Sequence, residues 1–177
     1  MNGRTIILLC LALLCAPGLS AQKQHRQPLN ERQIEQIREA GVYPNERIKL
    51  YAQFVGEQVD AIEALGKRGR SSARTQRLDD ALLDLAALVD ELSSNLDQYG
   101  DRKADLRKAL KGINESAPRW RETLGALPTE PGIDLSRKEA LESLQDLSEQ
   151  TTQLEKEQTA YFETHKDEKG QDRAETK

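Results

Sequence analysis

The side chains that most often carry out chemistry in proteins are scarce in this chain. It contains two cysteines and two histidines among 177 residues. Cys10 and Cys15 lie in an apolar stretch near the N-terminus, while His25 and His165 lie off the apolar helix faces described below. A catalytic base or a metal ligand needs rigid support from its neighbours, which neither histidine position offers. We therefore expect no metal site and no cofactor.

Carboxylates are abundant, since the chain has 30 Asp and Glu residues. Two carboxyl groups beside a cleft are enough for glycoside hydrolysis. The acidic residues here follow narrow amphipathic helices that leave little surface for a cleft, so we interpret them as solvated helix faces. The sequence has no glycine-rich phosphate loop and no Gly-x-Ser-x-Gly motif. These observations predict a protein that is not an enzyme.

A run of basic residues without an intervening acid is a candidate binding site. Its members are Lys67, Arg68, Arg70, Arg74 and Arg77. Such a cluster can bind an anionic surface, for example lipid headgroups or an acidic polymer of the cell envelope. It can also serve the fold alone, because cations at the end of a helix offset the helix dipole. The second interpretation is the simpler one and is favoured.

The N-terminal 21 residues have the pattern of an export signal. Arg4 precedes an apolar run over residues 6–16, and the stretch ends at the small residue Ala21. Spanning a bilayer takes about 20 apolar residues, so this run is too short for a transmembrane helix. We expect residues 1–21 to be removed and the mature protein to be periplasmic or secreted, with no transmembrane segment. Cleavage there would also remove both cysteines.

The expected mature chain is acidic and rich in helix-forming residues. Removing Arg4 leaves 25 basic against 30 acidic residues, a net charge of 25 − 30 = −5. An acidic exported chain gives no reason to expect a nucleic-acid partner. Ala, Leu, Glu, Lys, Arg and Gln dominate the composition, which favours an all-α fold of the bundle or coiled-coil type.

Two helices are predicted in the first part of the mature chain. Residues 22–29 form a polar, flexible lead-in. A short helix over about residues 30–40 ends at Gly41, which can adopt a positive φ. Asn45 is placed to cap a second helix over about residues 45–65, and a loop rich in glycine and serine follows.

The middle of the chain carries a long apolar repeat that alternates steps of four and three residues. It runs from Leu78 to Leu127, and only Lys103 and Ala117 interrupt its series of large apolar positions. A 3.5-residue repeat of this length is typical of a seam between packed helices. Because the phase is kept across Gly100, we favour one long helix over residues 72–127, bent near Pro118. A break at Gly100 into two helices is the alternative.

The last helix is predicted from Asp134 or Ser136 to about His165, and residues 166–177 read as a disordered charged tail. Its apolar stripe contains the polar residues Thr151 and Gln158, so its second half is the weakest packing surface. A partner that completes this seam would contact Leu147, Leu154, Tyr161 and Phe162.

These helices can form a single domain over residues 30–165 in two ways. With one long central helix, the helices before and after it fold back antiparallel on its two halves and give an elongated bundle. With a break at Gly100, the same pieces form a compact up-down four-helix bundle. The seams can be satisfied within one chain or between two chains, so a homodimer is also compatible with the pattern.

Two resemblances bear on function. Residues 29–33, with the sequence Leu-Asn-Glu-Arg-Gln, resemble the Leu-Thr-x-x-Gln motif of Spy/CpxP-type periplasmic chaperones. Residues 39–51 together with 95–111 resemble an uncharacterised group of bacterial exported helical proteins with no known activity. The first resemblance implies a chaperone or stress adaptor, and the second implies only export and a helical fold.

The sequence thus predicts a non-catalytic exported protein. Its favoured function is that of a structural or protein-interaction module of the cell envelope, with another protein as its partner. The alternative is a periplasmic chaperone or stress adaptor of the Spy/CpxP type.

Overall fold

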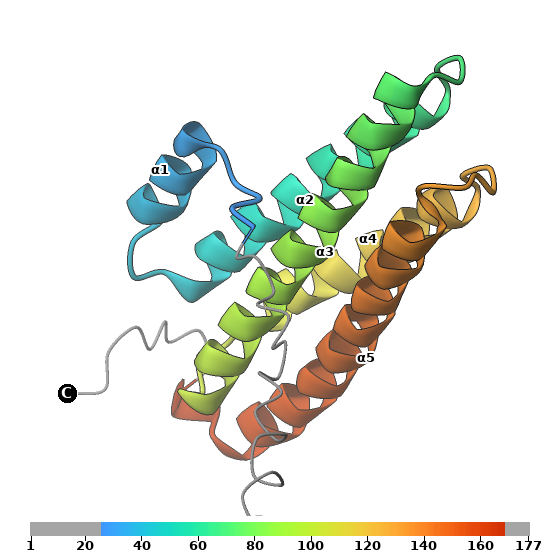
Figure 1. The fold of residues 1–177 in the computed structure, drawn as a ribbon. Coiled ribbons are helices and arrows are strands. Elements are labelled where there is room, and N and C mark those ends of the chain that lie inside the picture. The colour runs from blue at the N-terminus through green and yellow to red at the C-terminus, as the bar shows by residue number, and fades with distance from the viewer. Residues whose placement is uncertain (1–25, 169–177) are drawn as a thin grey trace, which may run out of the picture.

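The computed structural model describes residues 26–168, most of which lie in helices (Figure 1). The helices are α1 (Glu31–Glu39), α2 (Pro44–Gly66), α3 (Ser72–Asp101), α4 (Arg107–Gly125), α5 (Asp134–Thr164) and the short 3-10 helix η1 (Lys166–Glu168). No strand occurs within residues 26–168, which confirms the all-α class. The expected leader, with Cys10 and Cys15, and His25 lie outside the described residues.

Helices α2 to α5 form a four-helix bundle made of two antiparallel hairpins, α2–α3 and α4–α5. Helix α3 packs against α2 and α5, and α4 packs against the same two helices, so α3 and α4 lie at opposite corners. Helices α3 and α5 run in the same direction, as Figure 1 shows. Helix α1 packs against α2 alone and sits at the side of the bundle.

The bundle interior is built from the apolar stripes that the sequence predicts. Large side chains of all four bundle helices have less than a tenth of their surface exposed, among them Ile48, Tyr51, Leu82, Leu92, Ile113, Trp120, Leu144 and Leu147. Pro118 lies inside α4 without ending it. The stripes account for the fold class because each helix has one apolar face to bury.

The long helix expected over residues 72–127 does not form, and the alternative break is what the structure contains. The N–H of Lys103 donates to the Gly100 carbonyl at 2.9 Å, and the N–H of Ala104 donates to the Tyr99 carbonyl at 3.1 Å. This pair of bonds is a Schellman motif, which ends a helix through one residue with positive φ. That residue is Lys103, with φ of 57°. The helix therefore stops at Asp101, although the apolar phase continues.

The turn that follows is buried and is held by two amide side chains. Gln158 of α5 donates to the Ala104 carbonyl and accepts from the Leu106 N–H, both at 2.8 Å. Asn45 of α2 donates to the carbonyl of Asp105 and accepts from the N–H of Ala109 at 3.3 Å. Buried backbone groups need such partners, because an unsatisfied one costs the energy of its lost hydration.

Two further expectations about helix starts need correction. Asn45 is not a helix cap, because α2 begins at Pro44 without a side-chain cap and the Asn45 amide is used on the buried turn. No side chain caps α5 either: its N-cap is Ile133, and Asp134 instead accepts from the Glu130 N–H. In the part of the lead-in that the structure describes, Arg26 binds Asp84 at 2.8 Å. Residues 166–168 of the charged tail form η1, and the Tyr161 hydroxyl donates to Glu168 at 2.7 Å.

Replacing Gln158 by alanine should strongly destabilise the bundle. The change leaves a buried carbonyl and a buried N–H unsatisfied, at a cost of about 3 kcal/mol in unfolding free energy. Urea denaturation with an unchanged m-value measures this loss. The exposed Gln153 of the same helix is the matched control, and its alanine variant should lose less than about 0.5 kcal/mol. Equal losses from both variants would contradict the role of the Gln158 amide.

Replacing Lys103 by glycine should stabilise the protein by about 1 kcal/mol, because only glycine adopts positive φ without strain. Thermal unfolding measures the gain. The variant Lys156→Gly, inside α5, should instead lower the stability of the protein by about 1 kcal/mol, because glycine weakens a helix interior. A loss of stability in both variants would show that Lys103 is not strained.

Candidate functional site

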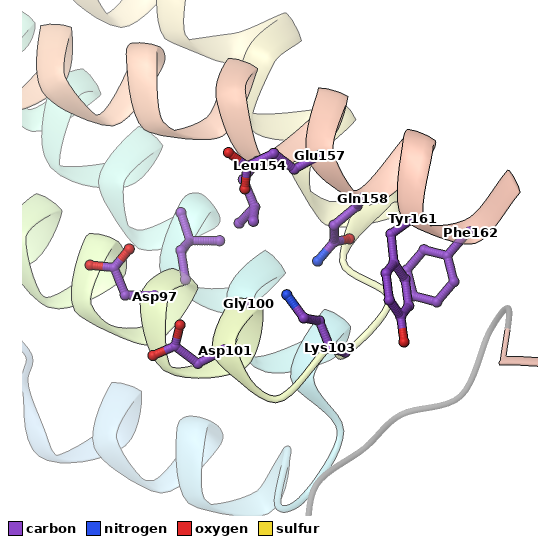
Figure 2. Close-up of a pocket in the computed structure, with 10 residues that line it drawn as sticks. Asp97, Gly100, Asp101, Lys103, Leu154, Glu157, Gln158, Tyr161 and Phe162 are labelled. Atoms are coloured by element: carbon purple, nitrogen blue, oxygen red, sulfur yellow. The ribbon is translucent and has the colours of Figure 1, made fainter. Parts of the chain in front are cut away.

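A pocket lies between the C-terminal end of α3 and the second half of α5 (Figure 2). Its volume is about 180 Å³. Helix α5 contributes Leu154, Glu157, Gln158, Tyr161 and Phe162, and the α3 side contributes Leu96, Asp97, Gly100, Asp101 and Lys103. Three of the four residues predicted to contact a partner thus meet here. The fourth, Leu147, has no exposed surface and belongs to the core.

The four predicted contact residues differ in what they can offer a partner. Phe162 is 1% exposed, so it belongs to the interior as Leu147 does. Leu154 and Tyr161 are partly buried at the pocket wall. The expectation of an open apolar seam along α5 is therefore wrong for Leu147 and Phe162, because α3 and α4 already pack against this helix.

The polar residues of the α5 seam are satisfied inside the molecule. The Thr151 hydroxyl lies 2.6 Å from the Asn114 side-chain oxygen and 2.9 Å from the Leu147 carbonyl. Gln158 binds the buried turn. Gly100 lines the pocket. A Cβ atom there would lie 3.2 Å from Leu154 Cδ1, so Leu154 of α5 packs closely against α3 at this position.

The pocket is acidic. Asp97, Asp101 and Glu157 face one cation, Lys103, for a formal sum of −3 + 1 = −2 over the lining. The Lys103 ammonium lies 5.7 Å from the centre of the Tyr161 ring. Asp97 accepts a hydrogen bond from Gln150 at 2.6 Å. In Figure 2 the carboxylates of Asp97 and Asp101 lie along one side of the pocket, opposite α5.

A second, larger hollow lies between the N-terminal segment and α3, and no pattern in the sequence predicts it. We call it the α1–α3 groove, and its volume is about 750 Å³. Its apolar wall consists of Pro28, Leu29, Ile34, Leu83 and Ala87, and its polar lining of Arg26, Gln27, Asp90, Glu91, Ser94 and Glu139. Leu83 lies beside the buried stripe of α3, so it contributes to the groove instead of the core.

The acidic groups of the groove have different surroundings. Glu91 accepts a hydrogen bond from the Tyr51 hydroxyl at 2.7 Å. Burial and this neighbouring carboxylate raise the pKa of Tyr51 to about 12. Arg26 sits at the groove with its guanidinium on Asp84 at 2.8 Å and on Asp80 at 3.3 Å. The α3 surface here thus already holds one cation.

One stripe of α3 connects the groove with the pocket. Its members recur at alternating steps of four and three, namely Leu83, Ala87, Asp90, Ser94, Asp97 and Asp101. Residues at this spacing lie on one face of a helix. The groove and the pocket are therefore two parts of a single surface, which we call the α3 face.

The basic cluster is divided between the fold and the surface. Arg74 is buried, and its guanidinium donates to the carbonyls of Leu65 at 3.2 Å and Gly66 at 3.0 Å and to the Glu130 carboxylate. It therefore satisfies the C-terminal carbonyls of α2 and joins them to the α4–α5 loop. The other four residues are exposed: Lys67, Arg68, Arg70 and Arg77. The interpretation that the basic cluster serves the fold therefore holds for Arg74.

Glu130 is the acidic centre of this contact. Its carboxylate accepts from the Thr75 hydroxyl and from Arg74, and these two bonds hold its pKa below the ordinary value of 4.5. A carboxyl group with a lowered pKa stabilises the folded state above its unfolded-state pKa. That stabilisation is lost as the pH falls through the lower, folded-state value.

The variant Glu130→Gln should therefore lower Tm at pH 7. The difference from the unchanged protein should shrink as the pH falls from about 4.5 through the lower, folded-state pKa of Glu130, because both proteins then carry a neutral side chain at this position. Thermal unfolding between pH 7 and pH 2 measures this dependence. Glu122, an exposed residue of α4, provides the control, since Glu122→Gln should leave Tm unchanged at every pH. A Glu130→Gln difference that does not vary with pH would refute the assignment.

Comparison of the chain with models of protein families, with curated proteins and with solved structures finds no match. No helix among the described residues is both long and apolar enough to cross a membrane. Within residues 26–168, no group of three or more His, Cys, Asp or Glu side chains could hold a metal ion. Both sequence resemblances stay predictions.

The residues that resemble the Spy/CpxP motif have a local structural role. Asn30 is the N-cap of α1 and accepts from the Gln33 N–H at 3.0 Å, while the Asn30 N–H donates to the Gln33 side chain at 3.1 Å. This reciprocal pair is a capping box, which satisfies free N–H groups at the start of a helix. Starting a helix therefore explains these two residues without reference to a chaperone function.

Proposed function

We propose that this protein is a non-catalytic, exported interaction module of the cell envelope, which binds another protein through the α3 face. The observation that carries the proposal is the alignment of the groove and the pocket on one stripe of α3. A protein partner fits this surface because the two hollows extend along a helix, whereas a small ligand would need one enclosed cavity. Export is supported by the pattern of residues 1–21.

The position of helix α1 supports the same conclusion. Helix α1 packs only against α2, yet its residue Ile34 and the preceding Leu29 form a wall of the groove. Apolar side chains that remain partly exposed around a hollow are typical of contact surfaces. Proteins that recognise a helix commonly place it in an apolar groove of this kind.

A photo-crosslinking amino acid at Ser94 should capture one protein in fixed ratio in the native cell. Ser94 is exposed and lies at the middle of the α3 face. The matched control is the same crosslinker at Glu122 of α4, the helix at the opposite corner of the bundle, which should capture little. Mass spectrometry of the crosslinked product identifies the partner.

Other results of this experiment would contradict the proposal. Equal capture from both positions, or none from either, would show that the α3 face is not the contact surface. Capture of many different unfolded proteins, each in less than equimolar amount, would instead favour the Spy/CpxP-type chaperone function.

A further inference from the structure

The two hollows of the α3 face differ in chemistry, and this difference restricts what can bind. The groove end presents apolar side chains from two chain segments, Leu29 and Ile34 on one side and Leu83 and Ala87 on the other. The pocket end presents the carboxylates of Asp97, Asp101 and Glu157, together with Lys103 and Tyr161. An occupant of the whole face therefore needs an apolar part and a positively charged part.

The length of the face matches one helix. Its stripe runs over residues 83–101, and 18 steps at about 1.5 Å per residue give a length of about 27 Å. Helix α3 is straight enough to be followed along this whole distance in Figure 1. A partner helix of about five turns would cover the groove and the pocket together.

The charge of the face favours a basic partner. The groove lining carries Asp90, Glu91 and Glu139 against Arg26, a formal sum of −3 + 1 = −2, and the pocket lining adds another −2. From Asp79 to its end at Asp101, α3 contains acidic residues and no basic residue. Arg26 shows that a guanidinium binds this surface, since it lies within hydrogen-bond distance of both Asp80 and Asp84.

On the basis of the proposed function, we infer that the α3 face binds a cationic amphipathic helix of a partner protein. Its apolar side chains enter the α1–α3 groove, and its Lys or Arg side chains lie over the carboxylates of the pocket. The charges steer the approach of the helix and fix its direction, while the burial of apolar surface supplies affinity.

A second copy of the described chain fits the face less well. The large hydrophobic side chains that are well exposed within residues 26–168 are Val42, Tyr43 and Leu135. The first two lie in the turn between α1 and α2, and the third is alone at the start of α5. They do not form the apolar helix face that the groove requires.

Fluorescence anisotropy with a labelled synthetic peptide tests the inference on the protein purified from the cells that produce it. The probe is an 18-residue amphipathic helix with leucines on one face and lysines on the other. It should bind, and raising the salt from 50 to 500 mM should weaken the binding at least tenfold. A peptide with glutamate in place of each lysine should not bind.

Two variants and two matched controls locate the binding site. The double change Asp97→Lys and Asp101→Lys should lower the affinity for the lysine peptide at least tenfold, and Leu83→Ala should lower it several-fold. Outside the α3 face, Glu122→Lys on α4 likewise reverses an acidic charge and Leu135→Ala on α5 likewise shortens a leucine, and both changes should have no effect. Circular dichroism confirms that each variant is folded.

Several results would overturn the inference. Equal binding of the lysine and glutamate peptides, or equal loss in variants and controls, would remove the charge argument. Self-association that the Asp97→Lys change abolishes would assign the face to a second copy. Tighter binding by a synthetic peptide of residues 1–25 would assign it to this chain's own N-terminal segment.

The failure of this inference can be told from the failure of the proposed function. If the crosslinker at Ser94 captures one stoichiometric partner but the cationic peptide does not bind, the interaction function stands and the chemistry of the partner is different. If the crosslinker captures nothing specific, the proposed function itself fails.

Discussion

A buried chain reversal can exist only if its backbone polar groups find partners, and Gln158 and Asn45 supply them in this bundle. Their amides each donate one hydrogen bond and accept one on the segment between α3 and α4 and on the first turn of α4. A side-chain amide can do both at once, because it carries a carbonyl oxygen that accepts and an NH2 group that donates. Because one amide comes from α5 and the other from α2, the same contacts join all four bundle helices at this end.

The candidate surface depends on this reversal. The turn sends α4 to the corner opposite α3, so α3 packs against α5 on one side and against α2 on the other. Lys103, Gly100 and the end of α3 then meet the second half of α5, where the pocket forms. Gln158 is a polar residue in the apolar seam of α5. By binding the turn it fixes the geometry of the pocket, and it is also one of the lining residues.

The stripes of the individual helices were predictable because each reports a local property, the burial of one helix face. The break after Asp101 was predicted only as the alternative, because the apolar phase continues through it. Continuation of the phase favours one helix, but two helices that face the same core can also keep it. The residue that indicates the break is Lys103. It is a polar residue at an otherwise apolar position of the repeat, and it adopts positive φ. The groove was beyond prediction, because it depends on where α1 packs.

The charge distribution gives the strongest reason to regard the α3 face as functional. Asp97 and Asp101 lie at the C-terminal end of α3, where acidic side chains oppose the helix dipole. Beside them runs α5, with eight acidic residues against three basic ones, so the two parallel neighbours repel each other. Within the described residues, Gln150 on Asp97 and Arg26 on Asp84 offset part of that cost. Residues that destabilise the fold are expected where a sequence serves binding. Here such acidic residues lie on the stripe that joins the groove to the pocket.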